Sequence, residues 1–350
     1  MTRGLEKRVD CRYNEERGRV SFDAFVFGDI YQKIKAANKA KTMTDSETTA
    51  QSARPSTLFA EPFVADDSPT VESCARIVES ESGVLLGDAE RVLKMFPDQS
   101  VQMVVTSPPY WSLRDYHIDG QIGLEKSVYQ YIERLADVFD EVKRVLKDDG
   151  TFWLNIGDSY TSGGRKWRAP DGKNRARAMS VRPDTPEGLK PKELIGVPWR
   201  LAFALQSRGW YLRSDIVWDK PNCQPESVKD RPTKCHEYMF LLSKSERYKY
   251  DVDAVKGPNG RRIRDVWSVN TRSYKEASGH FAIFPIELIE PCIQFGSGEG
   301  DLVLDPFMGA GTSAVAASRL GRRFVGIELN PDYYNLSLNR LCAEGLRVTS

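Results

Sequence analysis

The chain has 350 residues and a formal net charge of +1, with 40% hydrophobic and 28% charged residues. A chain of this length can bury a sizeable core, so we expect one main domain with additions. A net charge so close to zero excludes a uniformly basic nucleic-acid binder, and any contact with phosphates must come from a local basic surface.

Signals for membrane insertion and for metal binding are missing from the sequence. No apolar run is long enough to span a membrane, and the charged first residues lack the apolar core of a signal peptide. The six cysteines form no C-x-x-C pair, which argues against a structural zinc site. We therefore expect a cytoplasmic protein with no metal site and no membrane partner.

Residues 1–80 differ in composition from the rest of the chain. The stretch 39–57 is rich in Ala, Thr, Ser, Lys and Gln and shows no apolar period, which is typical of a linker or a disordered segment. We interpret residues 1–80 as a variable, partly disordered N-terminal extension and residues 81–350 as the main domain.

From residue 83 onward, apolar runs alternate with segments of helical period, as in an α/β domain. Strands are predicted at 84–86, 101–105, 152–156, 211–218, 237–242, 301–304 and 323–327. Helices are predicted at 131–146, 191–206, 285–295, 312–320 and 332–343. The strands at 211–218 and 237–242 can pair antiparallel, whereas the others have the continuous apolar character of buried parallel strands.

The segment Ser107-Pro108-Pro109-Tyr110 directly follows the second of these strands. Its prolines fix the backbone and remove two hydrogen-bond donors. The Ser107 hydroxyl and the Pro108 carbonyl can then accept hydrogen bonds from an exocyclic amine, while Tyr110 or Trp111 can stack on a ring. Cytosine N4 and adenine N6 both fit this description. Their lone pair is delocalised into the ring, and acceptors that draw the hydrogens out of plane would localise it for attack.

A glycine turn, Asp305-Pro306-Phe307-Met308-Gly309-Ala310-Gly311, joins a predicted strand to a predicted helix. Glycines let backbone approach a ligand closely, and a helix N-terminus favours a negative group such as an amino-acid carboxylate. Glu328 ends the next strand, where an acidic residue conventionally binds ribose hydroxyls. Phe307 could contact the ligand or pack in the core, and the sequence leaves both roles open.

The same glycines also satisfy the weak fingerprint of NAD-binding proteins, Gly309-x-Gly311-x-x-Ala314. Dinucleotide binding normally requires a second mononucleotide half, and too few residues follow the turn to form one. The position of the turn therefore favours a mononucleoside cofactor. Without this turn, the Ser-Pro-Pro-Tyr segment would be read as an ordinary proline-rich loop.

In this order, the two motifs resemble those of the amino-group DNA methyltransferases of the β arrangement, in which the catalytic motif precedes the cofactor motif. The resemblance covers residues 83–343. Further ordered matches are Gly87-Asp88, Asn155-Ile156-Gly157-Asp158, Trp218-Asp219-Lys220-Pro221-Asn222, Arg231-Pro232-Thr233, His236-Glu237-Tyr238 and His280-Phe281 with Phe284-Pro285.

The resemblance implies an α/β S-adenosylmethionine-dependent methyltransferase fold, circularly permuted, with a mainly parallel seven-stranded sheet and helices on both faces. It implies that Ser107, Pro108, Pro109 and Tyr110 hold an extruded base. The residues implied to bind S-adenosyl-L-methionine are Asp88, His280, Phe281, Phe284, Pro285, Asp305, Phe307, Gly309, Gly311, Thr312 and Glu328.

The target base depends on Ser107. Within the family, Ser at this position resembles the cytosine-N4 enzymes, whereas Asp is the usual mark of adenine-N6 enzymes. We therefore expect transfer to cytosine N4 in DNA, with adenine N6 as the alternative. Methylation at cytosine carbon 5 would need a Pro-Cys nucleophile, and Pro291-Cys292 lies on an apolar predicted helix, so we interpret Cys292 as a core residue.

Two basic segments are candidates for contact with double-stranded DNA, at about 160–192 and 243–279. A mobile basic loop beside a catalytic pocket could hold the phosphates around an extruded nucleotide, although charged runs are commonly solvated loops. The candidate residues are Arg165, Lys166, Trp167, Arg168, Lys173, Arg175, Arg177, Arg261 and Arg262.

Other functions are compatible with parts of this pattern. A catalytically inactive DNA-binding module would keep the fold, but both motifs are intact in the sequence. An RNA or protein methyltransferase could use the same acceptor row on other planar groups. No nuclease motif occurs, so a restriction endonuclease partner would be a separate chain.

Overall fold

The structure is a computed structural model that describes residues 12–14, 19–21, 69–162, 183–272, 284–346 and 348. The chain divides into two compact units, Met1–Asp66 and Asp67–Ser350. In the first unit, strands β1 (Arg12–Asn14) and β2 (Arg19–Ser21) pair antiparallel. The second unit begins at Asp67, whereas we expected the main domain to begin at residue 81.

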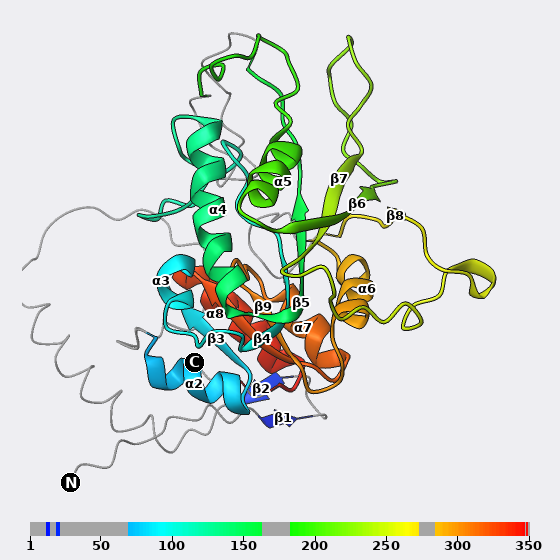
Figure 1. Cartoon of the computed structure of the whole chain (residues 1–350). Helices are drawn as coiled ribbons and strands as arrows, with labels where there is room; N and C mark the ends of the chain where they lie inside the picture. The colour runs from blue at the N-terminus through cyan, green and yellow to red at the C-terminus, as the bar shows by residue number, and fades with distance from the viewer. Residues whose placement is uncertain are drawn as a thin grey trace, which may run out of the picture. The chain divides into compact units, whose positions relative to one another are not determined.

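The second unit is built on one eight-stranded sheet with the order β3-β10-β9-β4-β5-β7-β6-β8 (Figure 1). Its strands are β3 (Gly83–Leu86), β4 (Val101–Thr106), β5 (Leu146–Ile156), β6 (Tyr211–Asp219), β7 (His236–Ser243), β8 (Val266–Ser268), β9 (Leu302–Asp305) and β10 (Arg323–Glu328). Five neighbouring strands run parallel, in the order β3, β10, β9, β4 and β5. Strand β7 pairs antiparallel with both β5 and β6. The expected antiparallel pair of β6 and β7 is confirmed.

The expectation of seven strands is wrong by one. Strand β8 adds to the free edge of β6 in parallel and contains only three residues. Its apolar signal is weak because it lies on the sheet edge, where Val266 is 58% exposed. A short edge strand of this kind leaves little hydrophobic periodicity to detect in the sequence.

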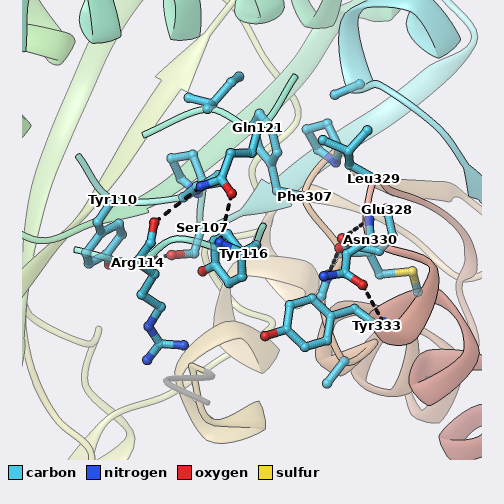
Figure 2. Close-up of a pocket in the computed structure, with 18 of the residues that line it drawn as sticks. Ser107, Tyr110, Arg114, Tyr116, Gln121, Phe307, Glu328, Leu329, Asn330 and Tyr333 are labelled. Atoms are coloured by element: carbon cyan, nitrogen blue, oxygen red, sulfur yellow. Dashed lines mark hydrogen bonds between the residues drawn. The ribbon is translucent and has the colours of Figure 1, made fainter. Parts of the chain in front are cut away.

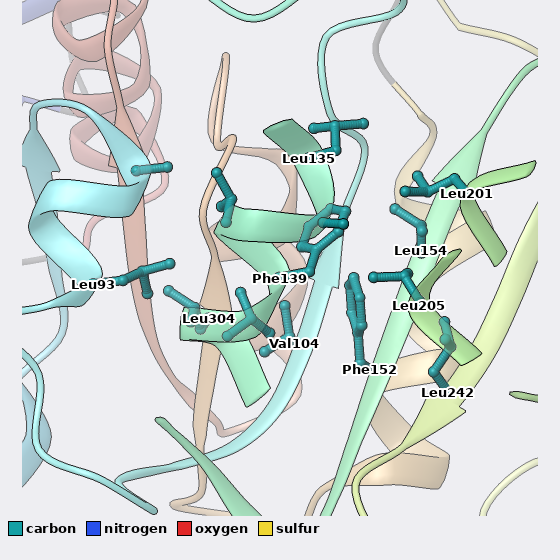
Figure 3. Packing of buried hydrophobic residues seen from close by; sticks show 14 of the residues in the cluster. Leu93, Val104, Leu135, Phe139, Phe152, Leu154, Leu201, Leu205, Leu242 and Leu304 are labelled. Atoms are coloured by element: carbon teal, nitrogen blue, oxygen red, sulfur yellow. The ribbon is translucent and has the colours of Figure 1, made fainter. Parts of the chain in front are cut away.

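Helices cover both faces of the sheet, as expected for this fold class. They are α2 (Val71–Glu79), α3 (Ala89–Leu93), α4 (Val128–Val145), α5 (Val197–Ser207), α6 (Ile286–Gly296), α7 (Thr312–Arg319) and α8 (Pro331–Ala343). Helices α2 to α5 contribute to one hydrophobic cluster and α6 to α8 to the other. Alternate residues of β5 take part in each, because Phe152 and Leu154 join the first cluster and Trp153 the second. Figure 3 shows the first cluster between α3, α4, α5 and the sheet.

Helix α5 begins later than the sequence pattern predicted. The expected helix over 191–206 starts only at Val197, because Gly196 adopts a left-handed conformation with φ 77°. The carboxylate of Asp158 accepts hydrogen bonds from the N–H groups of Gly196 and Val197 at 2.9–3.1 Å. A side chain 39 residues away therefore fixes the start of this helix, and local periodicity could not show that.

In the described part of the chain, no helix is both long and apolar enough to cross a membrane.

Candidate active site

A cavity of about 290 Å³ opens where several parallel strands end (Figure 2). Its lining includes residues 107–110 after β4, 306–310 after β9, 328–330 at the end of β10 and 87–89 after β3. Strands β4 and β9 are neighbours in the sheet. The sheet therefore brings the Ser-Pro-Pro-Tyr segment and the glycine turn to one edge, as predicted, although they are about 200 positions apart in the chain.

The cavity has two sides, named here after their predicted ligands. The cofactor side consists of residues 87–89, 306–310 and 328–330. The base side consists of residues 107–110 with Asn155, Lys220 and Glu237. Figure 2 shows Ser107 and Tyr110 apart from Glu328 and Asn330, with Phe307 between the two groups.

Asp305 connects the two sides from behind the glycine turn. Its Oδ1 accepts hydrogen bonds from the Thr106 hydroxyl at 2.5 Å and from the Phe307 N–H at 3.1 Å. Its Oδ2 accepts a hydrogen bond from the Ser313 hydroxyl at 2.6 Å. Asp305 is buried and is absent from the cavity lining. Burial raises the pKa of its carboxyl to about 6, although these hydrogen bonds oppose the shift. The structure thus gives Asp305 a positioning role at the base of the turn.

Glu328 holds the glycine turn against the end of β10. Its Oε2 accepts a hydrogen bond from the Gly309 N–H and its Oε1 from the Asn330 N–H, both at 2.8 Å. Burial raises the pKa of this carboxyl to about 7, and backbone hydrogen bonds partly offset the shift. Unlike Asp305, Glu328 lines the cavity, so a ligand can reach it.

The two glycines of the turn serve different purposes. At Gly309, with φ 53°, a Cβ atom would meet no atom within 4 Å, so the backbone is open on that side. At Gly311, with φ 77°, a Cβ atom would lie 3.2 Å from Ser337 of α8. Gly311 is also the N-cap of α7 and provides no side-chain cap. The first N–H groups of α7 are therefore free of a side-chain cap at the edge of the cavity.

The other predicted cofactor residues lie in several different places. Asp88, Phe284, Phe307 and Thr312 line the cavity. Asp88 also caps α3 by accepting a hydrogen bond from the Arg91 N–H at 3.0 Å. The position of Phe307 is compatible with both roles left open by the sequence, since it lines the cavity and its ring also packs edge-on against Phe139 at 6.2 Å. Pro285 is the N-cap of α6 and is absent from the lining, and His280 and Phe281 lie outside the described residues.

The base side is connected by side-chain hydrogen bonds. The Ser107 hydroxyl donates to the Tyr110 hydroxyl at 3.5 Å, and Tyr110 donates to Glu237 Oε2 at 2.8 Å. Glu237 Oε1 forms an ion pair with Lys220. This chain of contacts orients Ser107 so that its oxygen lone pairs can serve as acceptors at the cavity.

The neighbouring residues explain why this segment is rigid. The Tyr131 hydroxyl donates to the Pro109 carbonyl at 2.9 Å, whereas the Pro108 carbonyl has no donor within the described ranges. Pro108 therefore retains the acceptor that the sequence predicted. Gly157 provides room for Tyr110, because a Cβ atom there would lie 2.9 Å from the tyrosine ring. This contact gives a physical reason for the glycine in the Asn155-Ile156-Gly157-Asp158 match.

The expectation that Trp111 could stack on a base is wrong. Trp111 is only 5% exposed and belongs to the hydrophobic cluster beneath α4. Its indole N–H donates to the Glu125 carbonyl at 2.9 Å. Tyr110 lines the cavity, whereas Trp111 is the first residue of the turn that follows and is absent from the lining.

Several lining residues were not singled out from the sequence. Tyr116 and Tyr333 meet edge-on, with ring centroids 5.7 Å apart, and so connect the loop after β4 to α8. Gln121 fixes that loop, since its side chain accepts from the Tyr116 N–H at 2.7 Å and donates to the Arg114 carbonyl at 3.2 Å. No spacing rule connects these residues, so no local signal could have identified them.

The predicted DNA-contacting residues are described only in part. Arg165, Lys166, Trp167, Arg168, Lys173, Arg175 and Arg177 lie outside the described residues. Arg261 and Arg262 are exposed and follow the short 3₁₀ helix η2 (Pro258–Gly260), in the yellow loop that projects beyond β8 in Figure 1. Their charge is therefore available at the surface.

Two further interpretations can be compared with the structure. Cys292 is completely buried in α6, and burial raises the pKa of its thiol well above the usual range. This agrees with the core role expected for it. Within the described ranges, no group of three or more His, Cys, Asp or Glu residues could hold a metal ion.

Comparison with known proteins adds independent information. A profile of the DNA methylase family matches residues 101–339. The chain is 62% identical over 266 residues to type II methyltransferase M.Cfr9I of Citrobacter freundii, covering 75% of this chain and 88% of that protein. It is 54% identical over 276 residues to type II methyltransferase M.SmaI of Serratia marcescens, covering 77% and 94% respectively.

Two solved structures resemble the fold. PvuII DNA methyltransferase (cytosine-N4-specific) has a TM-score of 0.58 and 23% identity, covering 75% of this chain and 86% of that chain. A putative DNA modification methylase from Thermus thermophilus, complexed with S-adenosyl-L-methionine, has a TM-score of 0.56 and 26% identity, covering 77% and 98%.

Proposed function

Since this chain belongs to the S-adenosylmethionine-dependent DNA methylase family that modifies exocyclic amino groups, we propose that it transfers methyl groups to cytosine N4 at a specific site in double-stranded DNA. The single observation that carries the choice of base is Ser107, which lies on the cavity where the adenine enzymes usually have Asp. A neutral hydroxyl and the Pro108 carbonyl offer two acceptors for the two hydrogens of one amine.

The cofactor side has the features that S-adenosylmethionine needs. The backbone beside Gly309 is open, and the N-terminus of α7 carries uncapped N–H groups that suit a carboxylate. Glu328 and Asp88 present carboxylates to the cavity, where hydroxyl and amino groups can donate to them. When bound, the cofactor supplies an activated methyl group on a sulfonium.

The base side supplies positioning and polarisation. Ser107 and Pro108 would hold the amine hydrogens, and the Tyr110 ring, fixed through Glu237, would contact the flat face of the extruded base. Holding the hydrogens out of the ring plane concentrates the nitrogen lone pair for attack. The proton can leave to water afterwards, so this proposal assigns no general base.

The proposed biological setting is DNA modification paired with a separate restriction endonuclease. The two relatives compared above are named type II methyltransferases, which supports this setting. We expect the basic residues at 160–192 and 243–279 to contact DNA phosphates around the extruded nucleotide.

The decisive experiment identifies the methylated base. The protein is incubated with unmodified DNA and isotopically labelled S-adenosylmethionine, and the DNA is digested to nucleosides for mass spectrometry. N4-methylcytosine is the expected product, and Ser107→Ala is the variant that tests whether the label depends on this site. N6-methyladenine would overturn the cytosine assignment. Bound cofactor without any labelled base would instead support a DNA-binding module or a different substrate.

A further inference from the structure

A lysine–glutamate pair lies in the wall of the base side, and its lysine has no part in the mechanism above. Strands β6 and β7 pair antiparallel with Asp219 opposite His236. Lys220 follows β6 directly, and Glu237 is the second residue of β7, so the pairing brings both to one corner of the cavity. Their side chains are only 16% and 18% exposed, and they form an ion pair.

The surrounding contacts hold Lys220 in place. Its ammonium lies 4.1 Å from the centre of the Trp218 ring, a distance suited to a cation–π interaction. The backbone N–H of Lys220 donates to the Cys235 carbonyl at 2.8 Å, which joins the two ends of the loop between the strands. An ordered ammonium at a cavity wall can serve in recognition, whereas a solvated surface lysine usually cannot.

The hydrogen bonds of this wall leave N–H bonds of Lys220 without an acceptor among the described residues. Glu237 uses both carboxylate oxygens, one for Tyr110 and one for Lys220. The Asn155 amide donates one of its two N–H bonds to the Tyr238 carbonyl at 3.1 Å. An ammonium has three N–H bonds, and among the described residues Lys220 has no acceptor other than Glu237. Lys220 is therefore the charged donor that this wall can offer to a ligand.

The edge of cytosine calls for such a donor. Ser107 and Pro108 can hold the amine hydrogens, but the rest of that edge consists of two acceptors, the ring nitrogen N3 and the oxygen O2. Resting on the proposed function, we propose that Lys220 recognises the extruded cytosine by donating a hydrogen bond to O2, with Glu237 as its positioning residue. Adenine carries a carbon-bound hydrogen at the corresponding place and would leave Lys220 without an acceptor.

The pairing with Glu237 also suits the chemistry of the reaction. Positive charge develops on the base as the amine is methylated, and an unpaired ammonium nearby would oppose it. The Glu237 carboxylate offsets that charge while leaving N–H bonds free to donate. Other cations of the lining are placed differently, since Arg272 pairs with Glu287 at 2.5 Å and Arg114 interacts with Tyr116 and Tyr333.

The test removes each partner of the contact in turn. In a duplex that carries the mapped target site, the target cytosine is replaced by a 2-aminopyridine C-nucleoside, which keeps the amine and the ring nitrogen but lacks O2. We expect wild-type kcat/KM to fall about 30-fold on this analogue, because Lys220 loses its acceptor. Lys220→Met should lose a similar factor on cytosine but little more on the analogue.

Two results would overturn the contact. The first is that wild-type protein methylates the analogue as fast as cytosine. The second is that Lys220→Met lowers kcat/KM on the analogue by the same factor as on cytosine, so that the two losses multiply. The first result needs no variant, so it holds even if Lys220→Met folds poorly.

Lys244→Met is the matched control. Lys244 also pairs with a carboxylate, Asp148 at 3.1 Å, and is 19% exposed, but it follows the opposite end of β7 and is absent from the lining. The Lys244→Met protein should have the same ratio of kcat/KM on cytosine to kcat/KM on the analogue as the wild type. Glu237→Gln should reduce that ratio while leaving the Kd for S-adenosylmethionine unchanged, a split that general destabilisation would not produce.

The same reactions separate this inference from the proposed function. If wild-type protein forms N6-methyladenine, the cytosine assignment fails, and the O2 contact fails with it. If the product is N4-methylcytosine but the losses multiply, only the role of Lys220 is overturned.

Discussion

On the cofactor side of the cavity, backbone groups make most of the contacts. Glu328 accepts from the Gly309 and Asn330 N–H groups, and the turn depends on glycine conformations. On the base side, side chains bind side chains in the series Ser107, Tyr110, Glu237 and Lys220. The ends of three strands, β3, β9 and β10, build the first side, while four strands contribute to the second. Binding of a common cofactor can therefore persist while single substitutions change the choice of base.

Ser107→Ala should affect the base side alone and have the largest effect on turnover. Loss of one acceptor for the amine is expected to lower kcat about 100-fold, as for the loss of one preorganised hydrogen-bonding group in other enzymes. The Kd for S-adenosylmethionine should stay unchanged, because the hydroxyl contacts Tyr110 rather than the glycine turn. Single-turnover rates and calorimetric titration measure the two quantities. A parallel loss of cofactor binding would show that the two sides are not independent.

Asp305→Ala should affect both sides, since Asp305 bonds to Thr106 before one motif and to Phe307 in the other. Leaving buried donors without their acceptor is expected to lower the free energy of unfolding by about 2 kcal/mol. Chemical denaturation measures this value, and Ser107→Ala is the comparison variant with near wild-type stability. An equally stable Asp305→Ala protein would argue against the connecting role of this carboxylate.

The cofactor side should respond to pH through Glu328, whose pKa is raised to about 7. Hydroxyl groups of the cofactor donate better to the ionised carboxylate, so the Kd for S-adenosylmethionine should be about 10-fold weaker at pH 6 than at pH 8. Glu328→Gln should remove this difference. The variant also serves as the control for titration of the cofactor itself. A wild-type profile that matched the variant would contradict the predicted contact.

Stability should depend on pH in the opposite direction. The folded protein holds a proton on Glu328 that the unfolded chain releases near its ordinary pKa of 4.5. Without cofactor, the stability contributed by this proton is fully present below pH 4.5 and is lost as the pH rises through about 7. Unfolding of wild type and Glu328→Gln between pH 5 and 8 measures the difference.

The smallest expected effect concerns the DNA surface, outside both sides of the cavity. Replacing Arg261 and Arg262 together by Ala should raise the KM for DNA about 3-fold. The slope of the logarithm of the binding constant against the logarithm of the salt concentration should become less steep by about 1 to 2. Arg76→Ala on α2 is the control, because Arg76 is also exposed but lies outside the two basic segments. Unchanged salt dependence in the double variant would exclude these residues from phosphate contact.

Comparison of particular elements shows why some features could be predicted and others could not. Strands β4 and β9 and helix α4 carry continuous or helical apolar patterns, so local sequence was enough to find them. The start of α5 depends on Asp158, and β8 depends on its pairing with β6, so both escaped local patterns. Trp111 was misjudged because its partner, the Glu125 carbonyl, becomes adjacent only in the folded chain.

By itself, the sequence determined the α/β class, the family resemblance and the two motifs, because glycine, proline and strand-end residues act through their own backbone and near neighbours. Only the tertiary structure decided that Asp305 supports the turn from behind, that Glu237 fixes Tyr110, and that Lys220 faces the same cavity. These roles depend on which strands lie side by side. Sheet order follows from the packing of the whole domain, and no local spacing encodes it.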